Sequence, residues 1–232
     1  MDHNSPDPHP AGAGALVDPP EVEPQTAAAE ERLLALLLGG AKGGMPEDAW
    51  RRVEKLAAQH GVAELLYYRL SQQGSTIPSA YLQPLHKRFL VNAARNAFFF
   101  HELAHLLSAL HQRQVPVIVL KGAFLAEKIY QDIAARPMGD IDLLIQEDDQ
   151  LEVDAVLLGL GYQHQFHSLE RTDEAHALPY HHPQTRLVVE VHWVLMNVGY
   201  GMQADTPQLW QRASPATLVG LPALALAPED LI

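Results

Sequence analysis

Cysteine is absent from this chain of 232 residues. Without cysteine there can be no disulfide framework, no thiolate metal site and no cysteine nucleophile. Basic residues are also scarce, because 16 Lys and Arg face 28 Asp and Glu and leave a formal net charge of −12. Extensive nucleic-acid binding depends on many contacts between basic side chains and phosphates, so we do not expect it here.

The chain also lacks long apolar runs. The leucine-rich run at residues 33–38 is too short to span a bilayer. The N-terminus has no basic region followed by an apolar stretch, which a secretory leader would need. These absences predict a cytoplasmic, soluble protein with no membrane part.

The first half of the chain divides into a leader and a helical region. Residues 1–26 hold six of the 17 prolines and show no apolar period, which predicts a disordered leader. Residues 27–113 show helical patterns, with one helix from Pro46 to Gly61 and another over residues 62–73. Residues 79–112 predict a long amphipathic helix or helix pair from apolar residues three and four apart, namely Leu82, Leu85, Phe89, Ala93, Phe99, Leu103, Leu106 and Leu110.

Strand patterns begin at Val115. The order is strand, helix, strand, helix and strand pair, with the strands expected at residues 115–120, 139–145, 177–182 and 186–195. We therefore expect an α+β or α/β core with a small mixed sheet at residues 114–214, behind an all-helical region. Residues 215–232 are expected to start a C-terminal helical region, cut short after the helix-opening turn Pro228-Glu229-Asp230. Its uncovered apolar surface would favour self-association.

Three carboxylates are the main candidate site. Asp140 and Asp142 alternate along an expected strand, so both side chains point to one face about 7 Å apart. Glu190 on a second strand can join them. Converging carboxylate oxygens suit Mg²⁺. We expect Asp140 and Asp142 to face solvent.

Basic residues near these acids are candidates for binding phosphate. Lys121 and Gly122 stand where a helix is expected to begin, and a helix N-terminus attracts phosphate. Arg136 lies on the loop before the acids. For both basic residues, a solvated charge or a helix-capping ion pair is an equal alternative. His192 shares the strand face of Glu190, either as a catalytic or as a packed histidine.

Four motifs in order resemble a known family. They are Leu120-Lys121-Gly122-Ala123, Tyr130, Arg136-Pro-Met-Gly-Asp140-Ile-Asp142, and Glu190-Val-His192-Trp193. Together they resemble a bacterial family of uncharacterised nucleotidyltransferases in the DNA polymerase β-like superfamily. The resemblance covers about residues 30–232.

The resemblance implies a Mg²⁺-dependent transfer of a nucleotidyl group from an NTP to an acceptor hydroxyl, with two metal ions and with Mn²⁺ as an alternative. It implies that Asp140 and Asp142 ligate the metals and that Glu190 completes the site or accepts the hydroxyl proton. Gly122 and Ala123 take the place of the superfamily's glycine-serine turn. Because Ala123 has no hydroxyl, the backbone with Lys121 or Arg136 must hold the triphosphate. The acceptor stays open: a small molecule, a peptide, a protein or an RNA end.

Two other functions compete with this interpretation. His101-Glu102-Leu-Ala-His105 fits the helical motif of zinc metalloproteases. His111 has the third-ligand spacing of the longer form of that motif, but Ser108 replaces its glycine, so a continuing helix turns His111 off the metal face. The other alternative is a catalytically inactive regulatory protein with the nucleotidyltransferase fold.

Overall fold

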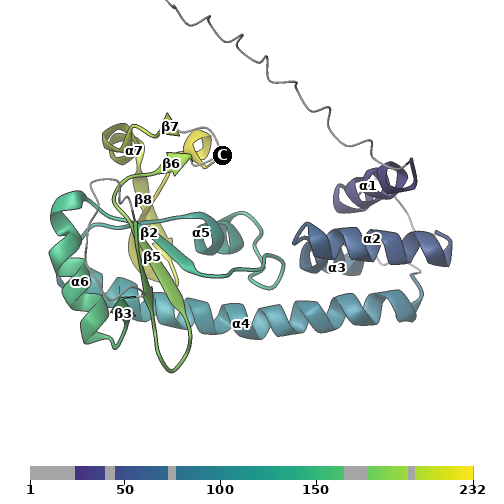
Figure 1. The fold of residues 1–232 in the computed structure, drawn as a ribbon, viewed down its shortest axis with the longest axis horizontal. Helices are drawn as coiled ribbons and strands as arrows, with labels where there is room; N and C mark the ends of the chain where they lie inside the picture. The colour runs from purple at the N-terminus through teal and green to yellow at the C-terminus, as the bar shows by residue number, and fades with distance from the viewer. Residues whose placement is uncertain (1–23, 40–44, 73–76, 165–176, 198–201, 232) are drawn as a thin grey trace, which may run out of the picture.

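The computed structural model describes residues 24–39, 45–72, 77–164, 177–197 and 202–231 (Figure 1). Residues 1–23, which make up most of the expected leader, lie outside the described residues. The first helix, α1 (Pro24–Leu37), begins within the last three positions of that expected leader.

Four helices build the N-terminal part. They are α1, α2 (Glu47–Gln59), α3 (Ala63–Gln72) and the long α4 (Ser79–Gln112), at the positions that the sequence predicts. In α2, Glu47 and Asp48 occupy the first turn, and Gly61 at φ +66° follows the helix end. Figure 1 shows α1, α2 and α3 beside one half of α4, and the sheet at its other half. The four helices enclose a core of their own around Trp50, Leu66 and Leu85.

The expected long helix is a single helix with an unexpected buried stripe. Most of its buried residues are three or four positions apart, and they are Leu85, Asn92, Asn96, Phe99, Phe100, Leu103, Leu106, Leu107 and Leu110. The stripe includes Asn92 and Asn96, which are both buried, whereas Ala93, expected in the core, is half-buried. Two amides therefore stand where the helical period calls for apolar side chains.

Seven strands form one mixed sheet in the order β3-β4-β5-β2-β1-β9-β8. The strands are β1 (Ile118–Val119), β2 (Ile141–Leu144), β3 (Gln163–His164), β4 (Ala177–His181), β5 (Val188–His192), β8 (Ser214–Leu218) and β9 (Leu221–Ala225). The β2–β5 and β1–β9 pairs are parallel and the others antiparallel. A separate short pair joins β6 (Met196–Asn197) to β7 (Met202–Gln203).

The two faces of the sheet are covered differently. Ile141, Leu143 and Ile145 face a large core that also takes in α4 and α6 (Gln150–Gly159), with the 3-10 turn η1 (Glu147–Asp149) leading into α6. Leu144 faces the other way, into a smaller core with Leu209 of α7 (Thr206–Arg212). Helix α5 (Lys121–Lys128) connects β1 towards β2. Asp142 alternates with Ile141 and Leu143, so it belongs to the α7 face.

The expectation of a helical segment at residues 215–232 is wrong. Strands β8 and β9 occupy most of it, and only Pro228–Asp230 forms a 3-10 turn, η2. The reason is the two-residue connection Val219-Gly220, where both residues have positive φ (48° and 77°). That geometry joins antiparallel strands in a tight hairpin. Because β9 pairs with β1, the sheet continues past residue 214, the expected end of the core.

No helix in these described segments has the length and apolarity needed to cross a bilayer.

Candidate functional site

The parallel pairing of β2 with β5 assembles the candidate site. Its register sets Asp142 beside Glu190 and Leu144 beside His192. Asp142 and Glu190 lie on the same face of the sheet as Leu144, which is the face on which α7 packs. Two residues 48 positions apart in the chain thereby become neighbours, as the strand patterns predicted.

The carboxylate of Asp142 lies at the centre of this group. Its Oδ1 accepts hydrogen bonds from Lys121 Nζ at 2.8 Å and from His192 Nε2 at 3.1 Å. His192 Nε2 is also 3.5 Å from Glu190 Oε2. One ligand atom from each of Asp142, Glu190 and His192 lies within 4.8 Å of the others. Two carboxylates and an imidazole at such distances can hold a divalent cation.

Asp142 does not face solvent as expected. It is only 4% exposed, because β5, Lys121 and His192 surround it. Burial alone would raise the pKa of Asp142, but the hydrogen bonds from His192 and Lys121 outweigh it and lower the pKa below its ordinary value. The buried carboxylate is therefore held as an anion.

Asp140 lies just before β2 and is half-buried. Burial, followed by the negative charges of Asp142 and Glu190, raises its pKa above the ordinary value. Repulsion from Asp142 and Glu190 acts on Asp140, which therefore lies near them, although it is not one of the three residues whose ligand atoms lie within 4.8 Å of one another. A bound cation would remove this repulsion, which favours cation binding.

Lys121 and Gly122 form the first turn of α5, at the position expected for phosphate binding. Lys121 has a φ of +39°, an uncommon value for a residue with a side chain, and its Nζ pairs with Asp142. Lys121 forms an ion pair, but its partner is Asp142, the candidate metal ligand, and the pair does not cap α5. A Cβ at Gly122 would come within 3.2 Å of Met138 Cγ, so glycine lets α5 approach the loop that carries Asp140. Ala123 is buried in the core.

Arg136 belongs to that loop. Its guanidinium lies over the ring of Tyr130, with Cζ 5.7 Å from the ring centroid. Its Nε is buried and has no hydrogen-bond partner among the described residues. A buried guanidinium N–H without a partner is a plain candidate for binding an anion.

Asn92 and Asn96 of α4 hold the loop in place. Asn92 Nδ2 donates to the carbonyl of Ala134 at 2.9 Å. Asn96 Nδ2 donates to the carbonyls of Ile133 and of Arg136, the latter at 2.7 Å. The sequence patterns did not predict these hydrogen bonds. Two asparagines at consecutive core positions of an apolar helix do indicate that their amides need buried partners.

The zinc-protease motif forms no three-ligand site among the described residues. His101 and His105 lie on an exposed face of α4, with their Nε2 atoms 3.2 Å apart. Glu102, the general base of such a motif, instead accepts a hydrogen bond from the Tyr162 hydroxyl at 3.2 Å. His111 lines a different hollow, beside β9, as its helical rotation predicts. The part of the chain that the structure describes holds a single group of three potential ligands, at Asp142.

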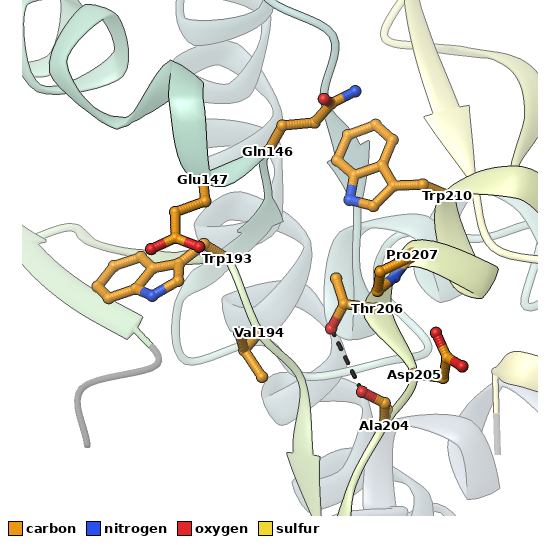
Figure 2. Close-up of a pocket in the computed structure, with 9 residues that line it drawn as sticks. All are labelled: Gln146, Glu147, Trp193, Val194, Ala204, Asp205, Thr206, Pro207 and Trp210. Atoms are coloured by element: carbon orange, nitrogen blue, oxygen red, sulfur yellow. Dashed lines mark hydrogen bonds between the residues drawn. The ribbon is translucent and has the colours of Figure 1, made fainter. Parts of the chain in front are cut away.

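A hollow of about 660 Å³ lies beside the site, beyond the ends of β2 and β5 (Figure 2). Gln146 and Glu147 follow β2, and Trp193 and Val194 follow β5. The start of α7, with Trp210, forms the opposite wall. The buried Trp193 also belongs to the large core, as expected from its place on the alternate strand face.

A family model described as uncharacterised nucleotidyltransferase matches residues 46–232. The chain belongs to this family. It is therefore an enzyme of the nucleotidyltransferase class, and the matched residues include the helical region, the carboxylate group and the C-terminal hairpin.

Solved structures of antibiotic-modifying enzymes are similar to this nucleotidyltransferase. The solution structure of the antibiotic-resistance factor ANT(2'')-Ia has a TM-score of 0.44 at 16% identity, over 59% of this chain and 69% of that chain. The same factor in complex with adenylyl-2''-tobramycin gives 0.43 at 16%, over 58% and 72%. Lincomycin-bound lincosamide antibiotic adenylyltransferase LnuA gives 0.37 at 14%, over 59% and 82%. A comparison with curated proteins found no match.

Proposed function

We propose that this nucleotidyltransferase moves a nucleotidyl group from an NTP to an acceptor hydroxyl, with Asp140, Asp142 and Glu190 holding Mg²⁺. The observation that carries the proposal is the convergence of Asp142, Glu190 and His192 within 4.8 Å on two paired strands. Asp140, whose pKa is raised by burial and by the negative charges of Asp142 and Glu190, is proposed as the third carboxylate. Family membership supplies the reaction class.

The donor set suits a hard divalent cation. Carboxylate oxygens are the ligands that Mg²⁺ and Mn²⁺ prefer, and three carboxylates carry three negative charges against the two positive charges of one cation. His192 has a different task in the proposal. Because its Nε2 lies 3.1 Å from Asp142 and 3.5 Å from Glu190, it orients both carboxylates towards one point. When bound, the metal supplies charge stabilisation for the phosphate that is transferred.

The phosphates are proposed to bind at the start of α5. The backbone N–H groups of Gly122 and Ala123 lie in the first helical turn, where free N–H groups favour anions. Lys121 is 58% exposed at its side chain, so it can leave Asp142 and contact a triphosphate once a cation replaces it there. Arg136 offers its buried Nε and its guanidinium from the loop opposite.

The proposed reaction is a displacement at the α-phosphorus. The acceptor oxygen forms the new bond to phosphorus, and the bond from phosphorus to the β-phosphate oxygen breaks, so that pyrophosphate leaves. The Glu190 side chain is more exposed than that of Asp142, so one of its oxygens can face the cation while the other accepts the hydroxyl proton. Transfer by positioned groups of this kind depends chiefly on geometry and charge.

Mn²⁺ binding by the full chain, measured by electron paramagnetic resonance with and without ATP, tests the proposal. Asp142→Asn and Glu190→Gln should each weaken Mn²⁺ binding at least tenfold, while Asp48→Asn on the exposed face of α2 serves as the charge-matched control. A pyrophosphate-release assay with hydroxyl-bearing acceptors then tests turnover. Unchanged Mn²⁺ binding in both variants would refute the metal site, and metal and ATP binding without pyrophosphate release would favour the inactive relative.

A further inference from the structure

The hollow beyond β2 and β5 lies at a point where the chain paths separate. These two strands are parallel neighbours, so their carboxyl ends meet at one edge of the sheet. From β2 the chain continues into η1 and α6, which pack on the large core. From β5 it continues through β6 and β7 into α7, which packs on the opposite face. Such a divergence leaves a crevice between the two layers, which is where ligands bind in open sheets of parallel strands.

The walls of this crevice combine aromatic rings with acids. Trp193 and Trp210 line it from its two sides, β5 and α7, as Figure 2 shows. Glu147 and Asp205 contribute carboxylates, and Gln146 and Thr206 contribute neutral polar groups. Of the described residues that line it, none is a lysine or an arginine. Its volume of about 660 Å³ is in the range of small-molecule sites.

Two indoles and two acids in one crevice favour an organic cation. Asp205 caps α7, with its Oδ1 accepting from the backbone N–H of Gln208 and its Oδ2 accepting from the side-chain amide of Gln208. Glu147 and Trp193 line the same side of the crevice in Figure 2. An indole face and a carboxylate attract the same partner, an organic cation with an apolar body. Lys121 and Arg136, the candidate partners of a triphosphate, are not among the described residues that line the crevice.

The crevice is distinct from the carboxylate group but close to it. Val194 is four residues beyond Glu190, which corresponds to about 13 Å along an extended chain. His192 stands immediately before Trp193, so the same strand end carries a residue of the candidate active site and a wall of the crevice.

We propose that this crevice, formed by Gln146, Glu147, Trp193, Val194, Asp205 and Trp210, binds a small organic cation with a ring or quaternary ammonium body. The site takes its selectivity from the two indoles and from Glu147. It binds its ligand independently of the nucleotide and of the divalent metal.

Isothermal titration of the full chain with phenyltrimethylammonium tests this site, with saturation-transfer NMR as the second readout. N,N-dimethylaniline is the matched neutral probe, because it keeps the ring and loses one methyl group and the charge. The ammonium probe should bind one equivalent, and the neutral probe should bind at least fivefold more weakly. A cation–π contact of about 1 kcal/mol corresponds to a factor of this size.

Variants locate the site. Glu147→Gln and Trp210→Leu should each weaken the ammonium probe about fivefold or more. Glu31→Gln on the exposed side of α1 removes the same charge, and Asp142→Asn disables the proposed metal site; both should leave binding of the ammonium probe unchanged. Equal affinity for the two probes, or full binding in both crevice variants, would overturn the proposal. Loss of binding in Asp142→Asn would place the probe at the carboxylate group and would also overturn it.

Discussion

Replacing Asn96 should loosen the loop that carries the candidate active-site residues. Asn96 is fully buried, with 0% exposure, and its amide nitrogen donates to two loop carbonyls, those of Ile133 and Arg136. Asn96→Ala removes both donors and leaves two carbonyls without partners. Two unpaired buried carbonyls cost about 2–6 kcal/mol together, and removal of the Asn96 Oδ1, which is buried without a partner among the described residues, offsets part of this, so the expected loss of unfolding free energy is about 2–5 kcal/mol.

The neighbouring asparagine provides an internal scale. Asn92 donates once, to Ala134, so Asn92→Ala should cost about half as much, roughly 1–3 kcal/mol. Asn96→Asp keeps the shape but has no N–H to donate, so it should destabilise at least as strongly as the alanine variant. Gln112→Ala, on the exposed end of α4, is the control and should stay within about 0.5 kcal/mol.

Urea unfolding followed by circular dichroism measures these differences. The same variants, tested while still folded, should bind Mg²⁺–ATP more weakly, because Arg136 and Asp140 lie on or directly after the loop. The reasoning is wrong if Asn96→Ala costs less than about 1 kcal/mol, or if Asn96→Asp is as stable as the native chain. Packing of the side chain, rather than its hydrogen bonds, would then hold the loop.

Three further predictions address other parts of the molecule. Burial, and then the hydrogen bond to Asp154, raise the pKa of Tyr180 above its ordinary value. The stability that comes from its neutral phenol is therefore complete below about pH 10 and is lost as the pH rises through the raised pKa. Phenolate absorbance at 295 nm, measured as the pH is raised, should show one fewer tyrosine that ionises at high pH in Tyr180→Phe than in the native chain. An unchanged number of such tyrosines would contradict the burial argument. Gly122→Ala should lower the free energy of unfolding by about 1–2 kcal/mol, because the added Cβ would lie 3.2 Å from Met138 Cγ. Thermal unfolding measures this change, and equal stability would mean that Met138 can move aside. The purified protein should contain no stoichiometric zinc, and His105→Ala should bind Mg²⁺–ATP as strongly as the native chain does. If the native chain held one equivalent of zinc and His105→Ala held none, the metalloprotease alternative would be favoured again.

The sequence by itself determined the elements and the three acids. Helix positions follow from a local period and local end signals, so α2, α3 and α4 agree closely with their predictions. The pairing of Asp142 with Glu190 was predictable because alternation along two buried strands leaves their polar residues on one face. The hairpin of β8 and β9 was missed because Val219 is β-branched and such residues rarely adopt the positive φ that this tight turn needs, so only Gly220 fits the usual turn pattern.

Only the tertiary structure decided the surroundings of those acids. Burial of Asp142 depends on Lys121 and His192, which reach it from two other elements of the chain. The hydrogen bonds from Asn96 to the loop span about 40 residues of sequence, and no local pattern states which carbonyls a buried amide will meet. The crevice between Trp193 and Trp210 exists because β2 and β5 send the chain to opposite faces of the sheet. Local propensities specify the elements, whereas partners and cavities arise from contacts between distant residues that form only when the elements pack.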